Sequence, residues 1–232
     1  MPASQSVFLF DAVGTLIHPE PSVAVAYHAA GLRHGSCLAI DEVDRRFRRA
    51  FAAEEALDAA SGSLRTDEAR ELRRWRSIVA AVFDDVPTAA HEELFQDLWD
   101  HFARPTSWRA FDDAAATLEA LQRRGATIAV GSNFDARLAP IVAELLPMVP
   151  PANVFASSTL GYRKPAPEFF AACLAKLDLR EPGELLIVGD DADNDFFGPR
   201  KLGYPALLLD RRDRHNEVTD RISSLADLFE ST

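Results

Sequence analysis

Short apolar runs that end abruptly at polar residues constrain the fold of this sequence more than any other feature. They occupy residues 7–10, 127–130, 185–188 and 206–209, with a weaker run at 154–157. Runs of this length, rich in Val, Ile, Leu and Phe, are typical of strands buried on both faces. Segments with helical spacing separate them. We therefore expect an α/β fold with a Rossmann-like parallel-sheet core and helices on both faces.

The interval from residue 18 to residue 104 interrupts this alternation because it contains no convincing strand. Apolar residues such as Leu72, Trp75 and Val79 recur there at helical spacing. We expect helices that begin near Val23, Asp41, Thr66 and Thr88. Prolines stiffen both ends of the interval. The pattern predicts a core domain of residues 1–17 and 105–232 and an inserted all-helical cap domain of residues 18–104. The alternative is that these helices pack as part of one layer.

Composition excludes several classes of protein. The formal net charge of −11 argues against a nucleic-acid partner. The N-terminus lacks the basic start of a signal peptide, and no apolar stretch is long enough to span a bilayer, so we expect a cytoplasmic protein with no membrane partner. Cys37 and Cys173 are far apart and are expected to be reduced. The oligomeric state is left open.

Polar residues follow the predicted strands at the point where an open parallel sheet binds its ligands. The set comprises Asp11, Thr15, Ser132, Asn133, Lys164, Asp190, Asp191 and Asp195. Clustered carboxylates repel one another, and a hard cation is a natural way to hold them together. A lysine and hydroxyls opposite that cation would bind a dianionic group. The set therefore favours phosphoryl transfer, in which a carboxylate can serve as the nucleophile.

Four segments carry a family resemblance. They read FDAVGTL from residue 10, GSNF from residue 131, YRKPAPE from residue 162 and VGDDADND from residue 188. In this order and spacing they resemble the signature motifs of the haloacid dehalogenase-like hydrolase superfamily, and the resemblance covers about the whole chain. It implies a Mg²⁺-dependent phosphohydrolase that acts on a small phosphorylated molecule through an aspartyl-phosphate intermediate.

The same resemblance implies a role for each matching residue. Asp11 would be the nucleophile, and Lys164 would neutralise it and its adduct. The implied catalytic set is Asp11, Thr15, Ser132, Asn133 and Lys164. The implied phosphate-binding set is Gly14, Thr15, Ser132, Asn133 and Lys164. The implied Mg²⁺ ligands are Asp11, the backbone carbonyl of Val13, Asp190, Asp191 and Asp195. For Asp191, an exposed position at a helix start is an equal alternative.

Val13 departs from the pattern of the superfamily's phosphatases. They usually carry at this position a second aspartate, which protonates the leaving oxygen. General acid–base help of this kind is typically worth roughly 10²–10⁴-fold. Three hypotheses follow from its absence: a phosphohydrolase that is weak on phosphate esters and prefers a good leaving group, a metal-independent 2-haloacid dehalogenase, or a degenerate relative that binds a ligand or partner. The intact acidic fourth motif favours the first.

The sequence gives weaker support for a replacement proton donor and for substrate-contacting residues than it gives for the motif residues. His18 is the nearest histidine to the first motif, and His28 and His34 lie in the predicted cap. Among the cap arginines, most of which should face solvent, Arg33 is a candidate for an anion contact. Three tryptophans are expected to pack within the core or between the cap and the core: Trp75, Trp99 and Trp108.

Overall fold

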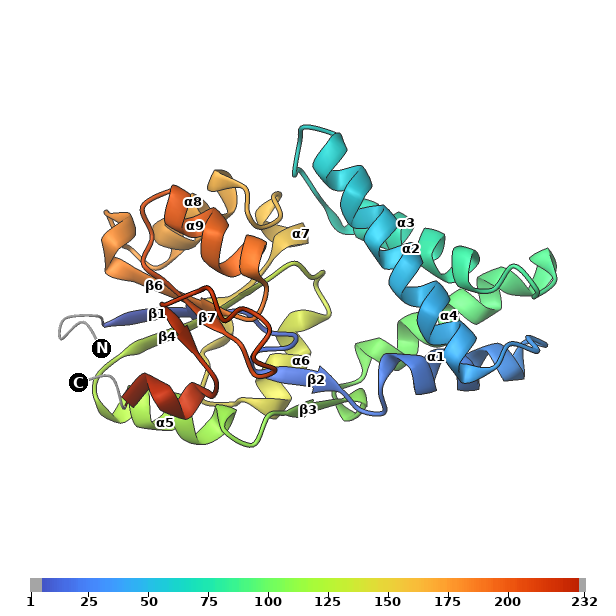
Figure 1. Ribbon diagram of the computed structural model, residues 1–232, viewed down its shortest axis with the longest axis horizontal. Coiled ribbons are helices and arrows are strands. Elements are labelled where there is room, and N and C mark those ends of the chain that lie inside the picture. Colours follow the sequence, from blue (N-terminus) through green and yellow to red (C-terminus); the bar gives the residue numbers. More distant parts are fainter. Residues whose placement is uncertain (1–5, 230–232) are drawn as a thin grey trace.

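A computed structural model describes residues 6–229, and its centre is a six-stranded parallel sheet (Figure 1). The strand order is β5-β4-β1-β6-β7-β8. The strands are β1 (Val7–Phe10), β4 (Thr127–Ser132), β5 (Val154–Ala156), β6 (Leu185–Gly189), β7 (Ala206–Leu209) and β8 (Arg221–Ile222). All five predicted strands are confirmed. The short β8 was not predicted, because a two-residue strand leaves no alternation to detect.

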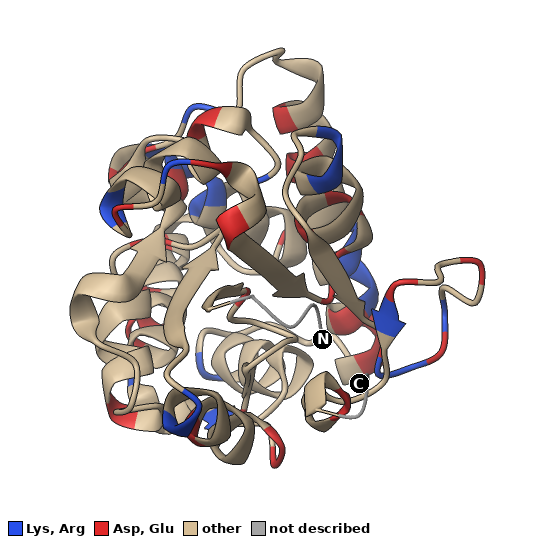
Figure 2. Cartoon of the chain, turned by 90° about the vertical axis from the view of Figure 1, so that its left-hand side faces the viewer, with Lys and Arg blue, Asp and Glu red and all other residues tan. Residues whose placement is uncertain are grey.

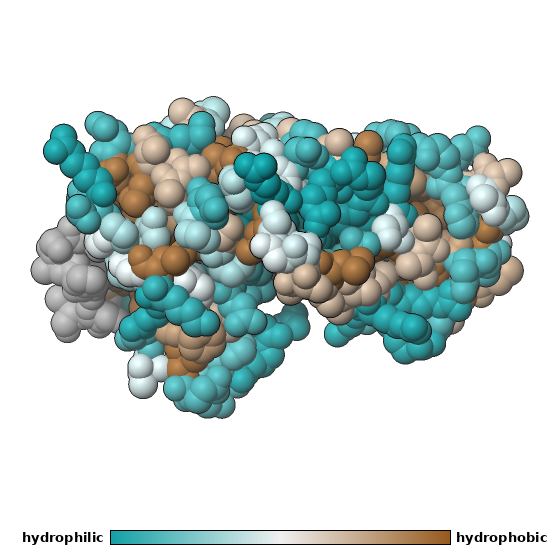
Figure 3. Space-filling model, turned by 90° about the horizontal axis from the view of Figure 1, so that it is seen from above, coloured by the Kyte–Doolittle hydropathy of each residue, from teal (hydrophilic) through white to brown (hydrophobic). Residues whose placement is uncertain are grey.

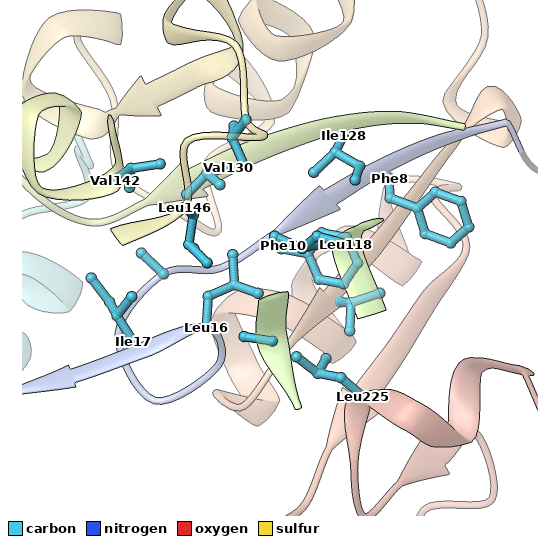
Figure 4. Close-up of a cluster of buried hydrophobic side chains, with 14 of the residues drawn as sticks. Phe8, Phe10, Leu16, Ile17, Leu118, Ile128, Val130, Val142, Leu146 and Leu225 are labelled. Atoms are coloured by element: carbon cyan, nitrogen blue, oxygen red, sulfur yellow. The ribbon is translucent and has the colours of Figure 1, made fainter. Parts of the chain in front are cut away.

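Helices cover both faces of the sheet, which confirms the predicted fold class. They are α5 (Ala114–Arg123), α6 (Leu138–Leu145), α7 (Ser157–Leu160), α8 (Pro167–Lys176) and α9 (Gly198–Lys201). Successive residues of β1 point to opposite faces. Phe8 and Phe10 belong to the cluster shown in Figure 4, whereas Val7 and Leu9 belong to a second cluster on the other face. A strand buried on both faces has to be apolar throughout, which explains the wholly apolar runs.

Four helices between β1 and β4 pack around a separate hydrophobic cluster. They are α1 (Val23–Arg33), α2 (Ile40–Ala60), α3 (Glu68–Val82) and α4 (His91–Ala103). Buried Tyr27, Ile78 and Phe83 belong to this cluster. The observed starts lie within three residues of the predicted ones, because Asp67 caps α3 and a short 3₁₀ turn at Thr88–Ala90 precedes α4. We call these helices the cap; its boundaries at residues 18 and 104 stay a prediction.

A two-stranded antiparallel ribbon joins the cap to the sheet. Its strands are β2 (Ile17–Pro19) and β3 (Trp108–Ala110), and His18 pairs with Arg109. Neither strand was predicted, because each has three residues and β2 ends in proline. The ribbon places both crossings between the sheet and the cap side by side (Figure 1).

The surface carries charges of both signs. In the view of Figure 2, basic and acidic residues are interspersed over the core. Seen from above, the core and the cap form two lobes with a notch between them on one side (Figure 3). No helix among residues 6–229 combines the length and the apolar character needed to cross a membrane.

Candidate active site

Three adjacent strands deliver the predicted site residues to one edge of the sheet. β1 lies between β4 and β6 in the sheet. Asp11 follows β1, Ser132 ends β4, and Asp190 follows β6. Because these strands are parallel, their carboxyl ends meet at the same edge. The convergence expected from the sequence is therefore present.

Lys164 connects two of the carboxylates. Its Nζ atom lies 2.6 Å from Asp11 Oδ1 and 2.6 Å from Asp195 Oδ1. The lysine is buried, which by itself lowers its pKa, but the charges of Asp11 and Asp195 outweigh burial and raise that pKa above its usual value. Ser132 Oγ also donates a hydrogen bond to Asp11 Oδ1, at 2.9 Å. Lys164 is thus a buried cation fixed beside the side chain of Asp11.

Three carboxylates form a compact acidic triad of Asp11, Asp190 and Asp195. An oxygen from each lies within 4.8 Å of the others. Burial, reinforced by the charge of Asp11, raises the pKa of Asp190 to about 6 even though Thr15 Oγ1 donates to it at 3.0 Å. Burial also raises the pKa of Asp195 to about 7, against the opposing charge of Lys164. One lysine does not balance three carboxylates, so the donor set fits a hard divalent cation.

Asn133 holds the backbone of Lys164. Its Oδ1 accepts a hydrogen bond from the amide of Lys164 at 2.7 Å, and its Nδ2 donates to the carbonyl of Lys164 at 3.1 Å. This reciprocal pair fixes the point from which the lysine side chain starts. The structure therefore places Asn133 as a positioning residue for Lys164.

Asp191 lies beside the triad and has a structural task there. Its Oδ1 accepts hydrogen bonds from the amides of Asp193 at 3.0 Å and Asn194 at 2.9 Å, and so it caps the π-helix at Ala192–Phe197. It lines the cleft above the triad but is outside the compact acidic cluster. The geometry fits the alternative that the sequence left open for this residue.

Two glycines let the backbone approach the carboxylates. Gly14 has φ +93°, and a Cβ built on it would lie 2.4 Å from Asp190 Oδ2. A Cβ on Gly189 would lie 2.3 Å from the carboxylate of Asp195. Since real Cβ contacts do not reach such distances, any side chain at either position would displace a member of the triad. The role of Gly14 in this structure is to make room for Asp190.

Comparison with known proteins decides the family. The sequence model of the haloacid dehalogenase-like hydrolases matches residues 6–203. The chain belongs to the haloacid dehalogenase-like hydrolase family. The resemblance drawn from the four motifs is thereby confirmed, and with it the prediction that the chain is a hydrolase.

This haloacid dehalogenase-like hydrolase has relatives with different names. It is 29% identical to haloacid dehalogenase-like hydrolase domain-containing protein 3 of Mus musculus over 203 residues, which cover 86% of this chain and 80% of the relative. It is 28% identical to ribulose-1,5-bisphosphate 5-phosphatase of Halopiger xanaduensis over 220 residues, which cover 93% of this chain and 90% of the relative. A solved dehalogenase in an intermediate complex has a TM-score of 0.73 and 17% identity, covering 99% of this chain and 98% of the other. That structural likeness shows the fold alone.

The cap of this hydrolase completes a cleft of about 260 Å³ above the triad. Phe51 and Glu55 of α2 line it together with Glu71, Arg74 and Trp75 of α3. The sequence did not point to these residues, because a single sequence does not show which face of a cap helix turns toward the core. Trp75 thus lies at the cap–core boundary, as expected, and part of it lines the cleft.

Arg163 links the core to the cap beside this cleft. It is buried, and its Nη2 lies 2.8 Å from Glu55 Oε1 while its Nη1 lies 3.1 Å from Glu71 Oε1. Arg74 forms ion pairs with the same Glu55 and with Asp58. Arg163 stands next to Lys164 in the third motif, so its position in the sequence was the one signal available for it. We call these five residues the cap–core ion network.

The histidines and the arginine that the sequence offered as weaker candidates do not line the cleft. Arg33 is paired with Asp97 of α4, with Nη2 to Oδ2 at 2.7 Å, and is mostly exposed. His18 packs against Phe111, with ring centroids 4.8 Å apart. His34 lies 3.3 Å from Asp97. Across residues 6–229, no histidine lines the cleft.

Proposed function

We propose that this hydrolase is a Mg²⁺-dependent phosphohydrolase that acts on a small phosphorylated molecule through a phosphorylated Asp11. One observation carries the proposal: a buried lysine bridges Asp11 and Asp195 while Asp190 completes an acidic triad. This arrangement leaves a negative cluster that a divalent cation would neutralise, next to a carboxylate that can attack phosphorus. The phosphatase name of the Halopiger xanaduensis relative supports the same reaction class.

The proposed reaction has two steps. An Asp11 oxygen forms a bond to phosphorus, the bond between phosphorus and the leaving oxygen breaks, and its electron pair stays on that oxygen. Water then attacks the phosphorus of the aspartyl phosphate, which releases phosphate and restores Asp11. Lys164 and the hydroxyl of Ser132, both bonded to Asp11 Oδ1, hold this carboxylate in place and offset its charge. Mg²⁺ held by Asp11, Asp190 and Asp195 would supply further neutralisation of the phosphoryl oxygens.

Val13 limits the range of substrates. It lines the cleft at the position where phosphatases of the family usually have an acid, and it has no proton to give. Two carboxyls of the cleft, Glu55 and Glu71, form ion pairs with arginines. Among residues 6–229, no histidine lines the cleft. Val13 itself gives the leaving oxygen no proton, so a leaving group that can depart as an anion is at an advantage. This favours substrates whose leaving group is a weak base, such as acyl phosphates.

A metal-independent 2-haloacid dehalogenase is the second candidate, and Val13 favours it because halide departs without a proton. Asp190 opposes it, because a further carboxylate beside Asp11 repels a carboxylate substrate. A degenerate relative that binds a ligand or partner, the third candidate, would turn over poorly.

A substrate panel with Mg²⁺ or with chelator separates these functions. The panel contains acetyl phosphate, p-nitrophenyl phosphate, sugar phosphates and 2-chloropropionate. We expect Mg²⁺-dependent release of phosphate, fastest from acetyl phosphate and lost in Asp11→Asn. Chloride release that persists in chelator would establish the dehalogenase instead. Silence on every substrate would favour the binding function.

A further inference from the structure

A second cavity of about 280 Å³ adjoins the cleft between the cap and the core. Nine of its sixteen lining residues are aromatic. They include Trp75 and Trp99 of the cap and Trp108 and Phe134 of the core side. An apolar cavity beside a reacting carboxylate is where the organic part of a substrate would lie.

The cavity and the cleft share a wall. Val13, Phe51, Trp75 and Asn133 line both. A molecule whose phosphoryl group lies at Asp11 would therefore pass Val13 and place its leaving group among the aromatic side chains. The residue that replaces the usual acid is thus also part of the apolar surface that the leaving group meets.

The charge present in this cavity is already paired. Arg137 is the one charged residue among those that line it. Its Nη2 lies 2.7 Å from Asp135 Oδ2, its Nη1 donates to the carbonyl of Trp99 at 3.1 Å, and its guanidinium lies 3.5 Å from the centre of the Trp99 ring. An ionised group placed here would lose its water without meeting a free counter-charge, which is costly.

The size of the cavity bounds its occupant. A cavity of about 150 Å³ with apolar walls is large enough to hold benzene. The larger volume here suits a fused bicyclic ring or a phenyl ring with a short apolar chain. Phe51 forms part of the wall, against Phe47 and Trp75, and is 37% exposed. A large aromatic side chain left that exposed on a helix presents apolar surface that a ligand can cover.

We propose that this cavity binds the uncharged, apolar aryl ring of the leaving group, while the ester oxygen stays at the cleft beside Asp11, so that the substrate is an aryl phosphate. The inference rests on the proposed function and names its substrate class. When the bond between phosphorus and oxygen breaks, the electron pair stays on the phenolic oxygen. A phenol has a pKa of about 10, against nearly 16 for water, so a phenolate departs without a proton donor far more readily than an alkoxide-like group. The apolar cavity and the absence of an acid at Val13 then have a common explanation.

Binding of the leaving group alone tests the ligand class without any turnover. Calorimetry in chelator would compare phenol, 2-naphthol and the polyhydroxyl probe ribose. We expect 2-naphthol to bind about fivefold to tenfold more tightly than phenol, because it buries more apolar area, and ribose not to bind. Equal affinity for phenol and 2-naphthol, or binding of ribose, would overturn the proposal.

A matched pair of variants on α2 locates the binding. Phe51→Gln places a polar side chain in the wall and should weaken 2-naphthol binding at least about fivefold. Leu57→Gln introduces the same residue on the same helix at a site that is 62% exposed and outside the cavity, and should leave binding unchanged. Equal behaviour of the two variants would place the bound 2-naphthol outside the cavity and overturn the proposal.

Kinetics separate this inference from the proposed function. We expect 2-naphthyl phosphate to have a lower KM than acetyl phosphate, Phe51→Gln to raise the KM for the aryl substrate more than that for acetyl phosphate, and Leu57→Gln to leave both unchanged. Turnover of acetyl phosphate without turnover of 2-naphthyl phosphate would overturn the aryl class and keep the phosphohydrolase. Binding of 2-naphthol with no turnover of any phosphate would support the ligand class of the cavity and overturn the phosphohydrolase.

Discussion

Arg163 and Lys164 are consecutive residues, but Arg163 binds a carboxylate of the cap whereas Lys164 binds a carboxylate of the core. Lys164 Nζ lies 2.6 Å from Asp11 Oδ1 at the end of β1, whereas Arg163 Nη2 lies 2.8 Å from Glu55 Oε1 on cap helix α2. Backbone hydrogen bonds reinforce the link, because the amide of Arg163 donates to the carbonyl of Leu64 at 2.8 Å. One dipeptide thus ties the position of the cap to the position of the lysine beside Asp11.

Arg163→Met should destabilise the protein and impair the site together. The change leaves Glu55, Asp58 and Glu71 without one of their cationic partners, and removing one partner of a buried pair costs about 3–5 kcal/mol. Urea unfolding measures the free energy of unfolding. Arg45→Met is the control, since Arg45 lies on α2, the helix that carries Glu55, and is 68% exposed, and it should leave the unfolding curve unchanged.

The same variant also tests whether Arg163 acts through position. We expect kcat to fall and to recover in part in Arg163→Lys, which keeps a charge but not the planar fork of donors. Loss of stability with an unchanged kcat would mean that the cap–core ion network is structural only.

Asp11→Asn should abolish turnover and keep the fold. Replacing the proposed nucleophile removes the atom that attacks phosphorus, so the rate should fall on the order of 10³-fold or more. Asparagine keeps an oxygen that can accept from Lys164 Nζ and Ser132 Oγ, and Lys164 keeps its ion pair with Asp195, so circular dichroism should show a folded protein. Activity within tenfold of wild type would exclude Asp11 as the nucleophile.

Much of the site followed from the sequence, because strand ends are easy to locate. Each apolar run stops at the carboxyl edge of the sheet, and the polar residues just beyond it have to converge. Asp11, Ser132 and Asp190 were placed in this way. Arg74 and Glu71 escaped prediction because they lie on a charged cap helix, where a buried arginine and an exposed one have the same spacing. Their burial depends on how the cap docks.

Val13→Asp should raise the hydrolysis of phosphate esters with poor leaving groups. An aspartate at this position would supply the missing proton, and such help is worth up to roughly 10²–10⁴-fold. The matched control is Val13→Asn, which has the same shape but no acidic proton. An equal gain in both variants would show that polarity and not proton transfer explains the effect. An aryl phosphate should gain least, because its leaving group needs no proton.

Mg²⁺ affinity should fall as the pH is lowered through the range where the triad takes up protons. The pKa of Asp190 is raised to about 6 and that of Asp195 to about 7, so Mg²⁺ has to displace protons at low pH. We expect the Kd to be on the order of tenfold weaker at pH 6 than at pH 8 by calorimetry. Asp190→Asn should bind more weakly at both values. A Kd that does not change over this range would contradict the buried triad.

The same shifts determine how stability depends on pH in chelator. Because the folded-state pKa values of Asp190 and Asp195 are raised, the folded protein binds more protons than the unfolded chain between about pH 4 and pH 7. This contribution is fully present below that window and is lost as the pH rises through it. In chelator, wild type should therefore unfold at a lower temperature at pH 8 than at pH 5. Asp190→Asn should show a smaller difference between the two pH values, because one of the two carboxyls is gone. Saturating Mg²⁺ should remove most of that difference.

The two cysteines should differ sharply toward iodoacetamide. Cys37 is exposed, whereas Cys173 is buried in the core and burial raises the pKa of its thiol to about 12. The thiolate is the reactive form, so native protein should incorporate one equivalent, at Cys37, and Cys37→Ser should incorporate none until it is unfolded. Fast labelling of native Cys37→Ser would mean that the cluster around Cys173 opens readily.

The pairing of β2 with β3 gives the inserted segment an unusual independence. Since Pro19 lies opposite Trp108, the chain leaves the core and returns to it at one place. The segment between these two residues is an insertion that contributes no strand to the six-stranded sheet. Such an insertion can be lengthened, shortened or exchanged without changing the order of the strands that carry the triad. A change in this segment can therefore alter the residues that line the cleft from the cap side while β1, β4 and β6 still carry Asp11, Ser132 and Asp190. A chimera carrying a relative's segment between these two strands should adopt the donor's substrate preference, and its turnover should still be lost in Asp11→Asn.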